Sequence, residues 1–329
     1  MRAVAMNVPP CPQLTVREQD RHGDAASALM SSAEPAGPEG QRSATGPARA
    51  CLVHQHFHYT YDGPIRDLRQ RLVVIPPERH GDQRLVLHHL EVSAPTSGYF
   101  RDVDRFGNLR LLLLVDAVRD AITFTVWFVT ERDPREGPIR VPAEIACEPM
   151  WLAHTPLTQP DATIAAAAMT IAAGSPSPLA QAREIAHWVH HRMRYEPGAT
   201  TVHTTAAEAL AQGAGVCQDY THIMLAMCRT CGIPARYVSG HLMGEGGSHA
   251  WVEVMLPDPD HPGRFVAHPF DPTHAHDPAL ETITVALGRD YTDVTPTSGT
   301  FISAFAGHLT ASKQAIAMPS AIVPLVPPR

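Results

Sequence analysis

The sequence lacks any apolar run that approaches the roughly 18 residues a helix needs to cross a membrane, although 44% of its 329 residues are hydrophobic. It also lacks an export signal, because prolines interrupt "MRAVAMNVPPCPQLTVREQD" before an apolar segment develops. Both absences favour a soluble cytoplasmic protein with no membrane partner.

Charge runs, disulfide spacing and nucleotide motifs are also missing. The formal net charge is −7 without a long run of one sign, which argues against a nucleic-acid partner. The six cysteines are irregularly spaced, unlike a secreted disulfide framework, so a reducing compartment is expected. No P-loop, dinucleotide fingerprint or alternating acidic calcium loop occurs, and no cofactor is therefore expected.

Composition divides the chain into four regions. Residues 1–50 are rich in Ala, Pro, Gly and Ser and are expected to form a disordered leader. Residues 51–150 contain short β-branched and aromatic runs separated by turns such as "DRFGN", which predicts a small antiparallel sandwich or barrel and then a linker. Residues 151–315 combine helical and strand patterns, which indicates an α+β region, and residues 316–329 are expected to be a C-terminal tail.

The α+β region shows clear helix and strand signals. Asp161 and Ser177 are suited to cap helices that start at the next residues. A third helix is predicted from Cys217 to about Cys231, with Gly232 as its stop. Three strands are expected in the segments "ARYVSGHLM", "HAWVEVML" and "RFVAHPF".

The stretch "GAGVCQDYTHIMLAMCRTC" places a cysteine where a helix begins. Cys217 is in the first turn of this helix, where free backbone N–H groups and the helix dipole favour an anion. A thiol in that field is expected to ionise more readily and to become nucleophilic. The preceding Gly-Ala-Gly leaves the backbone open to a substrate carbonyl, and the Cys217 N–H is a candidate oxyanion donor.

A thiolate nucleophile needs a histidine that carries protons and a group that orients the histidine. His249 begins a strand after a Gly-Gly entry, and Asp271 ends the next strand just before a proline. Neighbouring strand ends would bring both side chains towards Cys217. These residues are equally compatible with an inert packed cysteine, a satisfied strand histidine and a turn aspartate, so local pattern leaves both interpretations open.

The segments "GVCQDYTHIMLAMCRTCGIPARYVSGHL", "HAWVEVMLP" and "FDPTH" resemble the bacterial branch of the transglutaminase-like superfamily. The region 51–132, with "YTYDGPI" and "DRFGN", is similar to the N-terminal domain often fused to it. The resemblance implies an α+β protein, with a papain-like transglutaminase core preceded by a small antiparallel β-sandwich domain. It also implies that Cys217 is the nucleophile, His249 the general base and acid, and Asp271 the orienting residue.

This resemblance predicts an enzyme that acts on a protein or peptide through a thioester. Attack by water makes it a cysteine peptidase or amidase, which is the favoured expectation, and attack by a lysine amine makes it a transglutaminase. The contrasting alternative is a non-catalytic protein-binding module of the same fold. The sequence departs from the family in one place, since a tryptophan common before Asp-Pro-Thr has Phe265 as its nearest counterpart.

Four further residues are candidates for the cleft. Gln212 is considered as a second oxyanion donor, with a surface glutamine as the alternative. Asp219 and His222 flank the nucleophile on the side of the helix expected to be exposed, where they would shape the cleft or only face solvent. Trp251 follows His249 on the same strand face.

No metal site is expected. Cys228 and Cys231 form a CxxC without a matching second pair, so core packing is favoured over zinc. The histidines of "HQHFH" share a strand face, but no carboxylate or cysteine is spaced with them. A partly exposed strand edge is the preferred interpretation of that segment.

Overall fold

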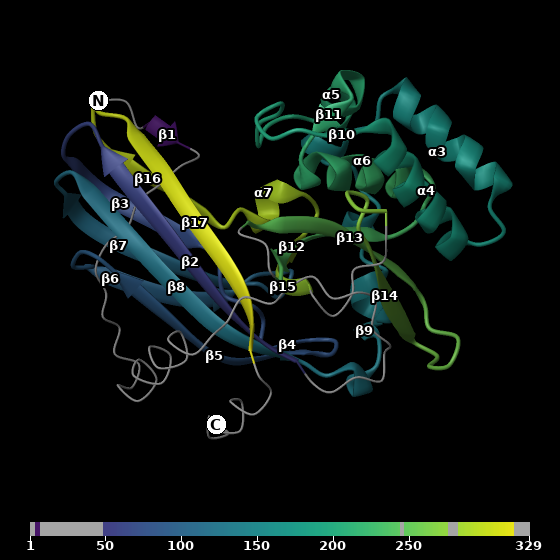
Figure 1. Ribbon diagram of the computed structural model, residues 1–329, viewed down its shortest axis with the longest axis horizontal. Coiled ribbons are helices and arrows are strands. Elements are labelled where there is room, and N and C mark those ends of the chain that lie inside the picture. Colours follow the sequence, from purple (N-terminus) through teal and green to yellow (C-terminus); the bar gives the residue numbers. More distant parts are fainter. Residues whose placement is uncertain (1–3, 7–48, 244–246, 276–281, 319–329) are drawn as a thin grey trace.

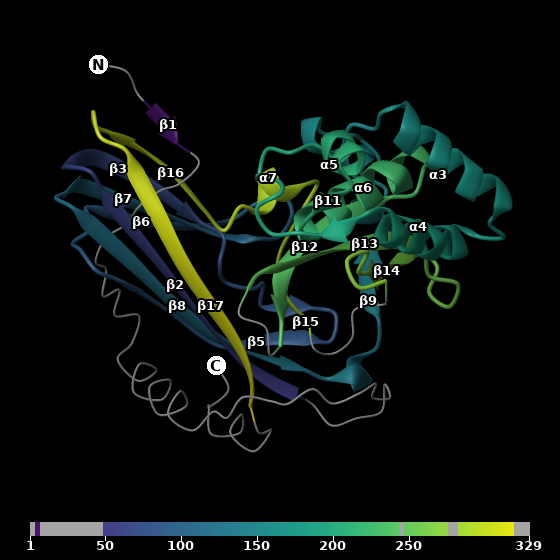
Figure 2. The same ribbon diagram turned by 45° about the horizontal axis from the view of Figure 1, so that its top comes forward.

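A computed structural model describes residues 4–6, 49–243, 247–275 and 282–318. Three five-stranded sheets dominate these residues, and a two-stranded sheet is added beside the helices. Figures 1 and 2 show two of the large sheets on the left, and the third with its helices on the right. The fold is therefore the α+β arrangement that the sequence predicted.

The two left-hand sheets form an antiparallel β-sandwich. Their strand orders are β1-β16-β3-β7-β6 and β17-β2-β8-β5-β4. Along β2, Val53, Gln55 and Phe57 are buried while the intervening histidines are partly exposed, as expected for a strand with one inward face. The strands of the first region are β2 (Arg49–Tyr61), β3 (Ile65–Leu72), β4 (Arg79–His80), β5 (Gln83–Val92), β6 (Gly98–Val103), β7 (Leu109–Val118) and β8 (Ala121–Arg132).

The C-terminal part of the chain returns to this sandwich, which corrects the expected end of the second region. β16 (Thr297–Ile302) pairs with β3, and β17 (Gly307–Met318) pairs with β2 along its whole length. The region 151–315 therefore includes sandwich strands, and residues 316–318 of the expected tail are the end of β17. The sequence gives no local sign of this, because backbone pairing between distant segments leaves no short-range pattern.

The expected leader is described only at Val4–Met6 and at its last two residues. Val4–Met6 forms β1, which pairs antiparallel with β16, and β2 begins at Arg49. The disorder prediction is wrong for these residues, because the edge of β16 supplies backbone partners that composition does not reveal. The rest of the leader and residues 319–329 of the tail lie outside the described residues.

The third sheet, with the order β15-β12-β13-β14-β9, is packed against helices. Its strands are β9 (Ile139–Pro142), β12 (Ala235–Leu242), β13 (His249–Pro257), β14 (Arg264–Phe270) and β15 (Thr282–Gly288). The helices of this region are α2 (Ala143–Ala146), α3 (Ala162–Gly174), α4 (Pro178–Arg192), α5 (Ala206–Gln212), α6 (Cys217–Thr230) and α7 (Tyr291–Val294). The side chains of Asp161 and Ser177 cap α3 and α4 as predicted.

Short elements complete the chain. These are the 3₁₀ turns η1 (Pro134–Glu136), η2 (Pro149–Trp151) and η3 (Pro156–Thr158), and the paired strands β10 (Arg194–Tyr195) and β11 (Ala214–Gly215). None of the helices in the described residues is long and apolar enough to cross a membrane.

Side chains of the sandwich bind the free edge of β15. The Gln83 side chain accepts from the Thr284 N–H and donates to the Thr284 carbonyl, each at 2.8 Å. Asn108 makes the same pair of bonds with the backbone of Leu287, each at 2.7 Å. Ile283 belongs to the apolar core of the sandwich. The two regions are therefore joined by apolar residues of β15 that pack in the sandwich core and by an edge strand whose backbone is satisfied from the other region.

Candidate active site

Cys217 is held at the first position of the most buried helix. Every residue of α6 from Gln218 to Arg229 is buried, and the helix packs against β12, β13 and three other helices. Cys217 itself is partly exposed and carries a free thiol. A rigid helix thus presents one reactive atom at its N-terminus, where the helix dipole favours a negative charge.

Asp219 fixes the chain just before the cysteine. Its Oδ2 accepts from the Val216 N–H at 2.7 Å and from the Thr200 hydroxyl at 2.6 Å. A Cβ at Gly215 would lie 2.5 Å from that same oxygen, so only glycine fits there. Asp219 is 1% exposed. The expectation that it lies on the exposed side of the helix is therefore wrong. Burial raises its pKa, against the hydrogen bonds that lower it.

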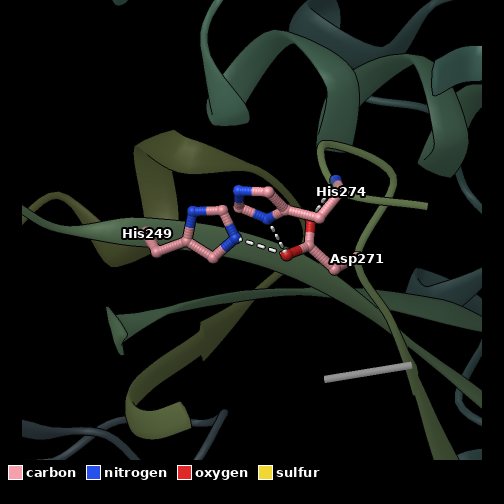
Figure 3. A group of neighbouring side chains, drawn as sticks. All are labelled: His249, Asp271 and His274. Carbon is pink, nitrogen blue, oxygen red and sulfur yellow. Dashed lines mark hydrogen bonds and ion pairs between the residues drawn. The ribbon is translucent and has the colours of Figure 1, made fainter. Parts of the chain in front are cut away.

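His249, Asp271 and His274 meet where β13 begins and β14 ends (Figure 3). His249 Nε2 lies 2.8 Å from Asp271 Oδ2, and His274 Nδ1 lies 2.7 Å from the same oxygen. The other carboxylate oxygen of Asp271 accepts from the Thr273 N–H at 2.9 Å. His249 is 6% and Asp271 0% exposed, so this carboxylate depends on protein partners for its hydrogen bonds.

The ionisation of His249 is set by its two neighbours. Burial lowers the pKa of the imidazole, but the hydrogen bond to Asp271 and the interactions with the charges of Asp271 and Cys217 raise it to about 10. The same contacts hold the pKa of Asp271 well below its ordinary value despite burial. The arrangement therefore favours a protonated imidazole between a carboxylate and the cysteine.

Comparison with known proteins identifies the family. The family model "Transglutaminase-like superfamily" matches residues 165–268, and that of the "Bacterial transglutaminase-like N-terminal region" matches residues 51–131. An uncharacterized protein of Mycobacterium leprae is 30% identical over 271 residues, which cover 77% of this chain and 93% of that protein. The chain belongs to the transglutaminase-like superfamily.

Two further known proteins are similar to this chain over more than half of its length. An uncharacterized protein of Mycobacterium tuberculosis is 29% identical over 251 residues, covering 68% of this chain and 79% of that protein. The crystal structure named "Putative Cysteine Protease from Cytophaga hutchinsonii" has a TM-score of 0.67 at 19% identity, and covers 84% of this chain and 92% of its own. At that identity the likeness concerns the fold, and it extends over more than the transglutaminase-like core alone.

Two other candidates of the transglutaminase-like core differ from their expected positions. The Gln212 amide donates at 2.8 Å to the Ala199 carbonyl, so this N–H is engaged in a loop and is a poor oxyanion donor. His222 is fully buried rather than exposed. Its Nε2 accepts from the Tyr291 N–H at 3.2 Å, and burial lowers its pKa to about 4. A helix covered on all sides has no solvent face, which explains this correction.

Trp251 and the cysteine pair lie where the sequence suggested. The Trp251 ring stacks on His249 with centroids 6.1 Å apart and restricts the orientation of the imidazole. Cys228 is buried in the apolar core of the helices, and the Cys231 thiol donates to the Ala168 carbonyl at 3.4 Å. Both cysteines of the CxxC are therefore core residues.

His274 is the site residue that the sequence did not single out. Its only signal is its place directly after Asp-Pro-Thr, where an aspartate that ends a strand turns the chain back on itself. The ligand atoms of His249, Asp271 and His274 all lie within 4.8 Å of one another. Two imidazoles and a carboxylate are donors that Zn²⁺ accepts, and here both rings bond the carboxylate directly.

Proposed function

We propose that the protein is a thiol-dependent amide hydrolase that acts on a protein or peptide. Cys217 is the nucleophile, His249 is the general acid and base, and Asp271 orients His249. One observation supports this assignment above all: the His249 ring bonds the Asp271 carboxylate at 2.8 Å, and Cys217 acts with Asp271 to raise the pKa of that ring. A thiol, an interacting imidazole and a carboxylate that orients the imidazole are what covalent catalysis by a thiol requires.

The reaction follows from these contacts. The Cys217 thiolate forms a bond to the amide carbonyl carbon, and the carbonyl electron pair moves to oxygen. When this intermediate collapses, the C–N bond breaks and the His249 imidazolium gives its proton to the departing amine, which leaves a thioester. Neutral His249 then takes a proton from water as the water oxygen attacks the thioester, and the C–S bond breaks to release a carboxylic acid and the thiolate.

Stabilisation of the oxyanion is assigned to the first turn of α6. The N–H groups of this turn have no acceptor within the helix. The Asp219 N–H bonds the Val216 carbonyl, which leaves the Cys217 N–H beside the reacting carbon as the donor. Removing one such donor from an amide-cleaving site typically costs two to three orders of magnitude in rate.

Hydrolysis and transfer to an amine share every step up to the thioester. The name of the Cytophaga hutchinsonii protein favours hydrolysis, and we adopt that reaction for this chain. Transfer to an amine is the alternative, and a protein-binding module without turnover is the second.

Mass spectrometry of a peptide library tests the proposal. The protein and its Cys217→Ala variant are incubated with the library, with and without an added primary amine. Cleaved or deamidated peptides from the unaltered protein alone are the expected result. A mass gain equal to the amine less ammonia would replace hydrolysis by transfer, and identical spectra for protein and variant would overturn the catalytic assignment.

A further inference from the structure

The chain contains a single lysine, Lys313, among 26 lysines and arginines. It lies on β17, directly opposite Gln55 of β2, and cross-strand partners point to the same face of a sheet. Gln55 is buried and donates to the Val74 carbonyl at 2.9 Å. The Lys313 side chain therefore lies on the inward-facing side of its sheet, although β17 is an edge strand.

This inward face meets the transglutaminase-like core at the end of β12. The ammonium of Lys313 lies over the Phe57 ring, 5.6 Å from its centroid. His241 of β12 approaches the same sheet, with its ring 6.3 Å from that of Phe128. The residue before His241, Gly240, is the backbone partner of His249. The sheet that carries Lys313 therefore contacts β12 at the residue next to the backbone partner of His249.

The charges around Lys313 agree with this position. The Cys217 thiolate and the Lys313 ammonium interact electrostatically, and so do Lys313 and His241. Burial lowers the pKa of Lys313 to about 8, and burial likewise lowers the pKa of His241 to about 3. Beside Lys313, the imidazole of His241 is therefore neutral and adds no second positive charge.

No carboxylate forms an ion pair with Lys313 within the part of the chain that the structure describes. The side chain is only partly exposed, and a partly desolvated ammonium is costly unless an anion accompanies it. Lysine in particular offers a compact point charge on a flexible stem, which suits an anion whose position varies. Among the described residues, the Cys217 thiolate is thus the negative group that acts on Lys313, and an anionic ligand could supply the ion pair that these residues do not form.

We propose that Lys313 binds a carboxylate of the substrate, close to the amide that Cys217 attacks. This inference rests on the proposed function for the identity of the ligand as a substrate. The carboxylate belongs either to an acidic side chain or to the free C-terminus of a peptide. In both cases the sandwich contributes a specificity-determining residue to a site whose reacting groups all come from the other region.

The single lysine allows a binding test that needs no turnover. Reductive methylation with ¹³C-formaldehyde labels Lys313 and the chain's α-amine only, and keeps both charges. The Cys217→Ala protein is titrated with three peptides of one sequence: one with a central Glu and an amidated C-terminus, one with Gln and a free C-terminus, and one with Gln and an amidated C-terminus. We expect the Lys313 signal to move, and its pKa to rise, with at least one carboxylate peptide and not with the third.

Kinetics supply the second test. The measured quantity is the ratio of kcat/KM for the carboxylate peptide to kcat/KM for the neutral peptide. Lys313→Met keeps most of the apolar stem and should lower this ratio about 10- to 100-fold, the range of a charge-assisted contact. Lys313→Arg should restore most of the ratio. Gln314→Met makes the same exchange at the exposed neighbour on the opposite face and should leave it unchanged.

The outcomes separate this inference from the proposed function. A shift of the Lys313 signal in Cys217→Ala supports the site even if no variant hydrolyses any peptide, in which case the proposed function fails alone. If the signal responds equally to all three peptides or to none, the inference is overturned whatever the turnover. A Lys313→Met protein that loses both activities equally, with Lys313→Arg no better, would also overturn it, since that pattern indicates a structural lysine.

Discussion

Two ionisable side chains, His249 and Glu253, project from the same face of β13, four residues apart. Their surroundings differ in one respect. His249 bonds Asp271 at 2.8 Å and interacts electrostatically with Cys217. Glu253 bonds His80 of the sandwich at 2.8 Å and Arg236 of β12 at 2.6 Å. Both groups are nearly inaccessible to solvent. Each is therefore a buried imidazole–carboxylate pair with a third member.

The third member decides what each pair does. Arg236 keeps its proton, so it places a permanent positive charge beside Glu253. Burial raises the pKa of Glu253, but the interactions with His80 and Arg236 hold it down at about 2. The third member of the other pair is a partly exposed thiol, which can exchange a proton and react. One pair joins the sandwich to the core sheet, and the other contains the groups to which the proposed function assigns the chemistry.

Replacing the thiol should produce the largest effect. Cys217→Ala removes the nucleophile and should lower turnover by on the order of 10⁴-fold or more, while the melting temperature stays within a few degrees of the original. Peptide hydrolysis and thermal unfolding are measured on the same preparation. Near-normal turnover, or iodoacetamide labelling of Cys228 before Cys217 in the folded protein, would remove the distinction between the two pairs.

Changing the orienting carboxylate should give the next largest effect. Asp271→Asn should lower kcat/KM by about 10²- to 10⁴-fold, since the orienting aspartate of such a triad has that order of effect. It should also move the alkaline limb of the pH profile to lower pH, because the carboxylate helps to hold the pKa of His249 at about 10. His274→Asn is the matched control and should cost less than about tenfold, since it leaves the His249–Asp271 bond in place. A profile that Asp271→Asn leaves unmoved would show that another group orients His249.

The Glu253 network should respond in stability instead of rate. Glu253→Gln leaves Arg236 buried without its anion and should lower the free energy of unfolding at pH 7 by about 3 kcal/mol. The pKa of Glu253 lies below its ordinary 4.5, at about 2, so this stabilisation is present above pH 4.5 and is lost as the pH falls towards 2. Urea unfolding at pH 7 and pH 3 should therefore show a smaller difference at pH 3.

The control for Glu253 is an exposed ion pair. Glu131→Gln breaks the contact with Arg84, which is 48% exposed, and should cost less than about 1 kcal/mol. If Glu253→Gln instead abolishes turnover of the folded protein, the second pair is part of the chemistry and the comparison fails.

Removing the side-chain hydrogen bonds between the sandwich and the edge of β15 should give the smallest effect. Asn108→Ala removes two hydrogen bonds to the backbone of Leu287 and should lower stability by about 2 kcal/mol, with turnover per folded molecule unchanged. Gln83→Ala, which removes the corresponding pair at Thr284, should behave alike. Loss of activity at constant stability in either variant would mean that these hydrogen bonds to β15 also position the side chains of the candidate active site.

Short-range sequence signals were sufficient to predict the helix and strand boundaries at the candidate site. The Gly-rich turn before Cys217 and the proline after Asp271 mark a helix start and a strand end, and α6 and β14 have those boundaries. The strand expected at "HAWVEVML" is β13, but the sequence did not show how deeply it is buried. Residues from His249 to Met255 are all buried, because helices cover one face of the strand and the sandwich covers the other.

The failures share a cause, since each depends on what is packed against an element. Helical spacing assigned Asp219 and His222 to a polar face, and polarity was read as exposure to water. Other parts of the protein cover that face. Likewise, nothing near Lys313 in the sequence indicates that β17 pairs with β2. Such pairings depend on the whole chain and not on a window of residues.

The pairing of β17 with β2 has a consequence during synthesis, because β17 is one of the last elements to be made. A ribosome produces the cysteine, the histidine and the aspartate before it produces β17. Until then the 13 residues of β2 have no neighbour on one side and present open backbone groups, which readily pair with other chains. A premature stop between Asp271 and Gly307 therefore yields a chain with all three reacting groups and an open strand edge, so that aggregation, not partial activity, is its expected fate.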